Sequence, residues 1–261
     1  MRIFEVQYQS AALGGDGEYC VLLPDRWQEN ADTLKVLFLL HGAFSEYKAS
    51  IIYSSIPRLC ENRNMAIVAP TCHLGVYTDM EYGENSYSML KEVVDLSVKM
   101  FPVLPTDPKR RFILGISMGG HGAYKLAMER PNDFSSVAAC SSPIDVVRTM
   151  TLLETGRHPG GAELYHAFGS SERYRGTQGD VIEMARRHKE NGDRLPRLFL
   201  CWGDEDHARF EDAVTVEKFK ALGIPLTTRM GKGGHNFDMW DPLMEGIIDW
   251  LLEGGEEHGA D

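Results

Sequence analysis

Two stretches near the start of the chain alternate apolar and polar residues with a period of two. They lie at Ile3–Gln9 and Glu18–Leu23. This alternation is typical of β-strands with one face buried and the other face exposed to solvent. Together the two stretches predict an antiparallel hairpin.

Further along, the pattern changes to short runs that are apolar throughout, separated by segments with helical spacing. Strands of this kind are buried on both faces, which is typical of a parallel sheet covered on both sides by helices. We therefore predict an α/β fold with a mostly parallel central sheet. The apolar runs lie at 35–40, 65–70, 111–116, 135–140, 197–202 and 225–230, and the helical segments lie near 49–63, 85–100, 118–130, 180–191, 208–222 and 240–252.

One connection is longer than the others. It runs over residues 141–179, between the strand that ends near Cys140 and the helix that begins near Asp180. Because compact domains rarely carry so long a plain loop, we interpret it as a cap-like insertion over one end of the sheet, where the active site is expected. The chain then predicts a single domain over 1–252, followed by an acidic, glycine-rich and flexible tail over 253–261.

The charge of the chain narrows the range of partners. Its 261 residues include 27 Lys and Arg against 38 Asp and Glu, which gives a formal net charge of −11 at pH 7. Because no basic patch offsets this charge, we expect no nucleic acid partner and no binding to anionic membranes. The longest aliphatic and aromatic run, Val36–Leu40, is far too short to span a bilayer.

The cysteines and the N-terminal stretch bear on location. The N-terminal stretch has no continuous apolar segment, so we expect no secretory signal. The five cysteines are scattered, odd in number and without a Cys-x-x-Cys pair. Because such thiols are typical of reduced proteins rather than of a disulfide framework, we expect a cytoplasmic location.

The stretch "ILGISMGGHGAY" places Ser117 between Gly115 and Gly119, at the point where a buried strand becomes a helix. A nucleophile elbow has this pattern because the serine sits in a tight, strained turn, where side chains two positions away on either side would collide. The motif therefore predicts that Ser117 is a nucleophile. His121 follows four residues later on the same helix, and we expect it to point elsewhere.

A serine hydroxyl is a poor nucleophile until a base removes its proton. In sheets of this type the partners follow in the chain order serine, acid, histidine. His235 suits the base because the glycine-rich loop "GKGGHNF" delivers it directly after the last predicted strand. The acid is expected after the preceding strand, where "GDEDH" offers Asp206 first and Asp204 second, with Asp145 as a more distant alternative.

The cluster "DEDH" also raises the question of a metal site. Consecutive side chains project in different directions and rarely converge on one ion. We therefore predict no metal and no cofactor.

Acyl transfer also needs two backbone donors near the developing negative charge. The N–H of Met118 directly follows the nucleophile. The second donor is expected in the loop "HGAF" after the strand 35–40, from Ala43 or alternatively from Phe44. His41 in the same loop is expected to brace it.

Five motifs of the chain together resemble the esterase D family of α/β hydrolases, and in particular its tributyrin-esterase-like branch. They are "LLHG", "YTDMEYGENSY", "GISMGGHGAYKLAMERP", "CWGDED" and "GGHNFDMW". The resemblance implies the α/β-hydrolase fold, a triad of Ser117, Asp206 and His235, and oxyanion donors at Ala43 and Met118. It also favours Asp206 over Asp204, because the spacing from Asp206 to the histidine fits that branch.

The chain departs from the family after the histidine. Where the family often has H-x-W-x-x-W, this chain keeps only Trp240 and has Phe237 in place of the first tryptophan. The resemblance therefore does not carry over the shape of the acyl pocket.

The resulting expectation is a serine carboxylesterase that acts on small, short-chain acyl esters. We expect the insertion to border the acyl pocket, where Tyr165, Phe168 and Tyr174 either line it or serve packing. Relatives in the family lead to the alternative of an S-formylglutathione or feruloyl-type esterase. An acyltransferase and a non-catalytic binding protein with the same fold are two further alternatives. Self-association is left open. The residues expected to contact substrate are Phe44, Tyr77, Asp79, Tyr82 and Trp240.

Overall fold

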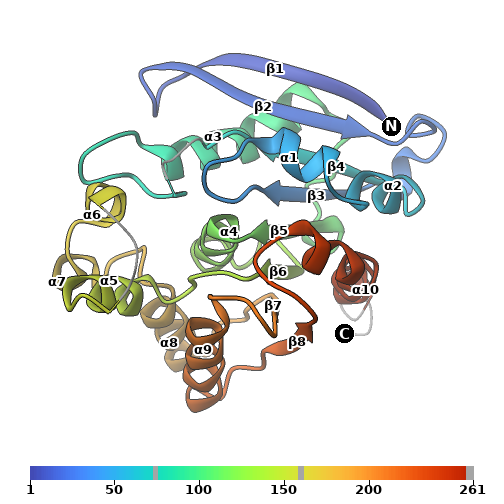
Figure 1. Ribbon diagram of the computed structural model, residues 1–261. Helices are drawn as coiled ribbons and strands as arrows, with labels where there is room; N and C mark the ends of the chain where they lie inside the picture. Colours follow the sequence, from blue (N-terminus) through green and yellow to red (C-terminus); the bar gives the residue numbers. More distant parts are fainter. Residues whose placement is uncertain (73–75, 158–161, 257–261) are drawn as a thin grey trace.

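The structure is a computed structural model that describes residues 1–72, 76–157 and 162–256 (Figure 1). Its centre is one sheet of eight strands in the order β1-β2-β4-β3-β5-β6-β7-β8. The strands are β1 (Arg2–Ser10), β2 (Gly15–Leu23), β3 (Lys35–Leu40), β4 (Met65–Pro70), β5 (Arg111–Ile116), β6 (Ser136–Cys140), β7 (Arg197–Gly203) and β8 (Thr227–Gly231). All eight strands were predicted to within a few residues.

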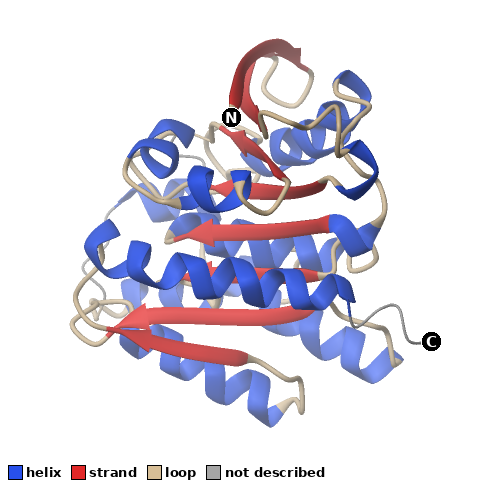
Figure 2. Ribbon diagram, turned by 90° about the vertical axis from the view of Figure 1, so that its right-hand side faces the viewer, coloured by secondary structure: helices blue, strands red, loops and turns tan. Residues whose placement is uncertain are grey.

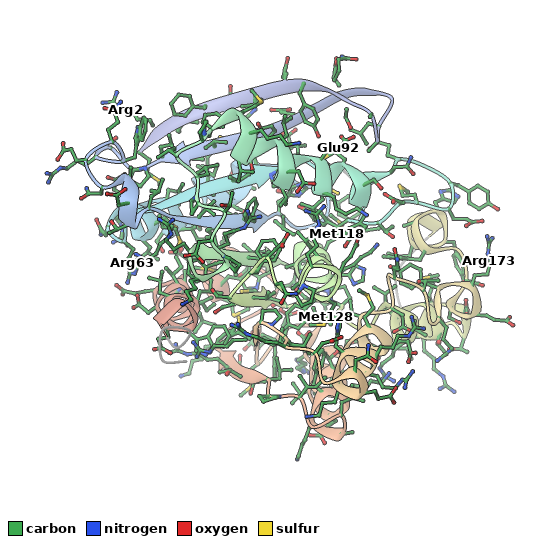
Figure 3. The ribbon with its side chains drawn as sticks, turned by 180° about the vertical axis from the view of Figure 1, so that it is seen from behind. Arg2, Arg63, Glu92, Met118, Met128 and Arg173 are labelled. Carbon is green, nitrogen blue, oxygen red and sulfur yellow. The ribbon has the colours of Figure 1, made fainter. Side chains whose placement is uncertain are left out.

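The pairing of the strands confirms the predicted hairpin and the mostly parallel sheet. β1 pairs antiparallel with β2, and β2 pairs antiparallel with β4. From β4 onward every neighbouring pair is parallel. Glu92, on the adjacent helix, anchors the hairpin by accepting hydrogen bonds from the Ser10 hydroxyl (2.5 Å) and the Ala12 N–H (2.8 Å) (Figure 3).

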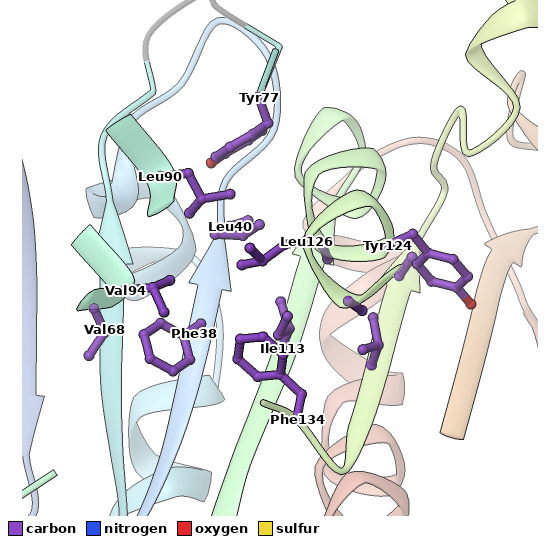
Figure 4. Packing of buried hydrophobic residues seen from close by; sticks show 14 of the residues in the cluster. Phe38, Leu40, Val68, Tyr77, Leu90, Val94, Ile113, Tyr124, Leu126 and Phe134 are labelled. Atoms are coloured by element: carbon purple, nitrogen blue, oxygen red, sulfur yellow. The ribbon is translucent and has the colours of Figure 1, made fainter. Parts of the chain in front are cut away.

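Helices cover both faces of the sheet (Figure 2). Alternate residues of each parallel strand therefore enter different cores: Ile113 packs on one face, and Phe112 and Leu114 pack on the other. Figure 4 shows Ile113 beside Phe38 and Phe134 in the first core. The helices are α1 (Tyr47–Ile52), α2 (Ile56–Glu61), α3 (Ser86–Met100), α4 (Met118–Glu129), α5 (Val146–Glu154), α6 (Ala162–Phe168), α7 (Ser171–Tyr174), α8 (Val181–Asn191), α9 (Arg209–Ala221) and α10 (Phe237–Glu256), with 3-10 turns at Ala31–Thr33 and Pro108–Arg110.

Two predicted helices differ from those observed. The segment 49–63 forms two short helices, α1 and α2, instead of one. Pro57 lies in the first turn of α2, where its missing N–H is tolerated. Because the residue before a proline disfavours helical dihedrals, a new helix starts at this point and α1 does not continue into α2. At the other end, α10 continues to Glu256. Residues 253–256 of the predicted tail are therefore helical, and 257–261 lie outside the described residues.

The described part of the insertion 141–179 contains three helices, α5, α6 and α7, which were not predicted from the sequence. They gather at one end of the molecule (Figure 1). They share a small apolar core of their own, made by Val146, Val147, Met150, Ala167, Phe168 and Tyr174. This core explains how so long a connection is held in a compact fold.

Two further expectations can be compared with the described residues. All five cysteines are free and buried, as predicted for reduced thiols. Among the described helices, none is both long enough and apolar enough to cross a bilayer.

Candidate active site

Ser117 occupies a strained turn between β5 and α4. Its φ of 54° and ψ of −121° lie where a residue with a side chain is rarely found. A Cβ on Gly115 would lie 2.1 Å from the Gly119 carbonyl oxygen, and a Cβ on Gly119 would lie 2.2 Å from that of Leu40. Both positions therefore require glycine for steric reasons, which is the local geometry predicted from the motif.

His235 lies in the loop between β8 and α10 and reaches Ser117 from the other side of the site. Its Nε2 is 2.8 Å from the Ser117 Oγ. Its Nδ1 is 3.0 and 3.2 Å from the two carboxylate oxygens of Asp206. Because a carboxylate only accepts hydrogen bonds, Nδ1 carries a proton and Nε2 is left to accept the serine proton.

Asp206 is fully buried after β7. Burial by itself raises the pKa of its carboxyl group, but hydrogen bonds from His235, the Ser141 hydroxyl and the Ala208 N–H outweigh burial and lower that pKa to about 2. The Ala208 bond is 2.8 Å long. Asp206 is therefore an anion at neutral pH, and His235 and the Ala208 N–H hold it in place.

The two alternative acids have other partners. An oxygen of Asp204 accepts the Gly233 N–H at 2.8 Å, which braces the loop that carries His235. Asp145 begins α5 by accepting the Arg148 N–H, and it forms a 2.5 Å ion pair with Lys218. Of the three candidates, only Asp206 hydrogen-bonds to His235.

Ser141 supports Asp206 and had no signal in the sequence. Its Oγ accepts the Trp240 Nε1–H at 2.9 Å. Because the indole can only donate, the hydroxyl proton of Ser141 remains available to the Asp206 carboxylate, and Ser141 helps to lower the pKa of that group. Trp240, expected to contact substrate, is instead buried against this serine and lies edge-on to His235, with ring centroids 5.0 Å apart.

Ser117 opens into a cavity of about 370 Å³, which we call the acyl cavity. Ala43 and Met118, the expected oxyanion donors, both line it. Met118 is the first residue of α4, so its N–H has no acceptor within the helix and can point at a ligand. The other lining residues are Val76, His121, Ser141, Pro143, Val146, Thr149, Arg157, Leu164, Phe168, His207, Ala208, Phe210, Glu211 and His235.

The position of His121 corrects an expectation. It lines the acyl cavity instead of pointing elsewhere, because residues four apart lie on the same face of a helix and Ser117 precedes it by one turn. Burial, and then the charge of Lys125, lower the pKa of its imidazole to about 3. His121 is therefore a neutral wall of the cavity at physiological pH.

The other four residues expected to contact substrate also do not line the acyl cavity. Tyr77 is fully buried in the core beside His41. The Asp79 carboxylate accepts the N–H and hydroxyl of Ser88 at the start of α3. Tyr82 is 69% exposed, and Phe44 is 80% exposed over a separate surface hollow. The motif "YTDMEYGENSY" therefore acts locally to start α3 and fill the core.

Asp206, His207 and His235 bring three groups that can bind a metal within 4.8 Å of one another. Both ring nitrogens of His235 already face hydrogen-bond partners, Asp206 and Ser117. An ion bound there would have to displace one of these bonds. The absence of a metal stays a prediction.

Comparison with known proteins adds a family and close structural relatives. Residues 10–251 match the family model named Esterase. The acetyl esterase of Caldicellulosiruptor saccharolyticus is 24% identical over 262 residues, which cover 96% of this chain and 98% of that protein.

Two solved structures from Staphylococcus aureus each share 25% identity with the chain. One is FphF, a fluorophosphonate-binding serine hydrolase, with a TM-score of 0.83 over 96% of this chain and 98% of that one. The other is FrmB, an S-formylglutathione hydrolase, with a TM-score of 0.82 over 97% of this chain and 100% of that one. These likenesses confirm the α/β-hydrolase fold.

Proposed function

The chain belongs to the Esterase family of carboxylic ester hydrolases, and from that premise we propose that it hydrolyses short-chain acyl esters by nucleophilic catalysis at Ser117. The match agrees with the resemblance to the esterase D family. One observation carries the proposal: Ser117, His235 and Asp206 form a continuous hydrogen-bonded chain that opens into the acyl cavity.

In the proposed mechanism, His235 Nε2 removes the Ser117 proton as Oγ attacks the ester carbonyl carbon. The N–H groups of Met118 and Ala43 stabilise the negative charge on the carbonyl oxygen. Asp206 holds the imidazole tautomer and stabilises the imidazolium that forms. The imidazolium then protonates the leaving alcohol, and water activated by the same histidine releases the acyl group from Ser117.

The size and lining of the acyl cavity support a short acyl group. Its volume of about 370 Å³ must hold both the acyl and the alcohol parts of a substrate near Ser117. Val146, Leu164 and Phe168 supply apolar lining. Each methylene that fits into a dry cavity gains about 0.8 kcal/mol, whereas one that does not fit gains nothing. We expect the highest kcat/KM at or below about six acyl carbons.

The alternatives share the same site. Acetyl esterase and S-formylglutathione hydrolase relatives leave both oxygen esters and thioesters open as substrates. Transfer of the acyl group to an alcohol would follow if an acceptor other than water enters the cavity. A role in binding alone is disfavoured by the complete hydrogen-bonded chain at Ser117.

We also propose a cytoplasmic location, since five buried and unpaired thiols suit a reducing compartment. The division into one domain over 1–252, with a cap-like insertion over 141–179, is likewise a proposal. The shared apolar core of the insertion helices supports it.

A panel of 4-nitrophenyl esters from acetyl to dodecanoyl tests the function, with S-formylglutathione and methyl ferulate added. We expect hydrolysis that peaks at short acyl chains and no rise in rate when substrate forms an emulsion. Product analysis in the presence of a primary alcohol separates hydrolysis from transfer. A maximum at decanoyl or longer chains would contradict the short pocket, and no turnover of any substrate would contradict the esterase.

A further inference from the structure

A second cavity lies behind the acyl cavity, and one side chain lines both. This rear cavity has a volume of about 410 Å³, and its walls are about half polar and half apolar. Phe168, the last residue of α6, lines the rear cavity and also the acyl cavity. The lining of the rear cavity also includes Thr78, Asp79, Glu81, Tyr87, Lys125 and Tyr174.

Three aromatic rings form the partition between the two cavities. Phe168 lies edge-on to His121, with ring centroids 5.8 Å apart, and edge-on to Tyr174, at 5.1 Å. His121 belongs to the lining of the acyl cavity, and Tyr174 belongs to that of the rear cavity. The Tyr174 hydroxyl also lies 3.4 Å from His121 Nε2. Phe168 is therefore the central ring of the partition.

The backbone holds this partition in place. The Glu81 N–H donates to the Ala167 carbonyl at 3.0 Å, and the Tyr82 N–H donates to the His166 carbonyl at 2.9 Å. These bonds fasten the end of α6 to the loop that leads into α3. With Phe168 only 8% exposed, a ring flip out of the wall would expose apolar surface on both sides.

The rear cavity contains a buried cation. Lys125 is 4% exposed, its Nζ donates to the Thr78 hydroxyl at 3.2 Å, and it lies 3.8 Å from the centre of the Tyr87 ring. Two carboxylates share this lining. Asp79 accepts hydrogen bonds from Ser88, and its charge also acts on Lys125. Glu81 pairs with Arg173, which Figure 3 shows at the edge of the molecule. Burial lowers the pKa of Lys125 to about 8, so most of it remains charged at neutral pH.

The helix that carries Ser117 sets the distances. Along α4, His121 follows Ser117 by one turn and Lys125 by two turns, which are about 6 and about 12 Å of helix rise. An extended chain advances about 1.2 Å per bond. An acyl group of about six carbons therefore reaches the partition, and one of about eight to ten carbons would reach the neighbourhood of Lys125 if the partition were open.

Resting on the proposed esterase function, we propose that Phe168 is the specificity-determining residue that limits acyl length, because it closes the acyl cavity against a rear cavity that contains Lys125. Removing the ring joins the two cavities. The joined cavity ends in a polar region with a cation, so it favours an acyl chain that ends in a carboxylate over an alkyl chain of equal length.

The test compares Phe168→Ala with the wild-type protein on three substrates: 4-nitrophenyl acetate, 4-nitrophenyl octanoate and the mono-4-nitrophenyl ester of suberic acid. The last two share eight acyl carbons and differ in the terminal carboxylate. Relative to acetate, we expect kcat/KM for the suberate ester to rise about tenfold or more in Phe168→Ala, and for octanoate to rise less. Adding Lys125→Met should bring the suberate gain down to that of octanoate.

Phe210→Ala is the matched control, since Phe210 lines the acyl cavity but not the rear cavity and is 63% exposed. It should leave both eight-carbon ratios within twofold of wild type. Phe168→Leu, a milder change, should shift the ratios in the same direction as Phe168→Ala and serves if the alanine variant does not fold.

The proposal is overturned if folded Phe168 variants keep the wild-type ratios, or if Phe210→Ala shifts them equally. An unchanged suberate gain in the double variant would overturn the role of Lys125. Wild-type turnover of acetate tests the proposed function separately, because it does not depend on Phe168.

Discussion

Replacing Asp206 with asparagine removes the negative charge that faces His235 and keeps the size of the side chain. The carboxylate is fully buried and lies 3.0 Å from Nδ1. Across that distance, with an effective dielectric constant near 20, its attraction for the imidazolium is about 5 kcal/mol. This corresponds to about four orders of magnitude in rate, similar to the typical loss when such an aspartate becomes asparagine.

Asp204→Asn is the matched control, because it makes the same chemical change two residues earlier in the chain. Asp204 accepts the Gly233 N–H at 2.8 Å, and the amide oxygen of asparagine can accept the same bond. We expect a loss of less than about threefold in this variant. The assay is kcat/KM on 4-nitrophenyl acetate, with melting curves of both variants to show that they fold. Similar losses in the two variants, or the reverse order, would refute the assignment of Asp206.

The pH dependence of stability gives a second test of the interaction between Asp206 and His235. The pKa of Asp206 is lowered to about 2 in the folded protein, below the value near 3.9 of an unfolded chain. Its contribution to stability is therefore fully present above about pH 4 and is lost as the pH falls toward 2. The difference in melting temperature between wild type and Asp206→Asn should shrink over that range. A difference that stays constant below pH 4 would count against this reasoning.

Three further predictions test the site. Ser117→Ala should lower turnover about a million-fold and abolish labelling by a fluorophosphonate, whereas a labelled variant would show another nucleophile. Ser141→Ala leaves the Trp240 N–H without its acceptor, so we expect it to lower the free energy of unfolding by about 1–3 kcal/mol and kcat/KM about tenfold. The double variant Ser141→Ala/Trp240→Phe should recover stability but not rate, and additive stability losses would contradict this explanation. The carboxyl group of Asp212 is buried, and burial and the charge of Asp206 raise its pKa to about 9, although the Ser142 backbone acts in the opposite direction. A raised carboxyl pKa makes folding less favourable as the pH rises, so the stability of Asp212→Asn relative to wild type should increase between pH 5 and 8. A difference in stability between the two proteins that does not change with pH would exclude this explanation.

The elements that could be predicted from the sequence are those whose signal is local. Runs that are apolar on both faces indicate buried parallel strands, and all of them were found as strands. The last, β8, is not buried as expected, because it lies at the edge of the sheet and is mostly exposed. The turn at Ser117 could also be predicted, because the glycines at 115 and 119 are required by steric contacts with residues a few positions away or on the neighbouring strand. Chain order and the glycine-rich loop then pointed to His235, and the family resemblance favoured Asp206 over Asp204. The structure brings both residues into one hydrogen-bonded chain with Ser117.

Local signals failed where the environment of a side chain depends on distant segments. Tyr77 and Asp79 lie in a polar, aromatic-rich motif that suggests a binding loop, yet one fills the core and the other starts α3. The helices of the insertion were also missed, because they are short and are held by packing on one another rather than by a long periodic pattern.

By itself, the sequence determined where the strands lie along the chain and that Ser117 occupies a strained turn, because these depend on periodicity and on sterics between near neighbours. Only the tertiary structure decided that Trp240 hydrogen-bonds to Ser141 and that Phe168 divides two cavities. Trp240 lies 99 residues from Ser141, and such contacts arise when separate elements pack against one sheet. No local pattern encodes them, since their geometry is set by how all the layers fit together.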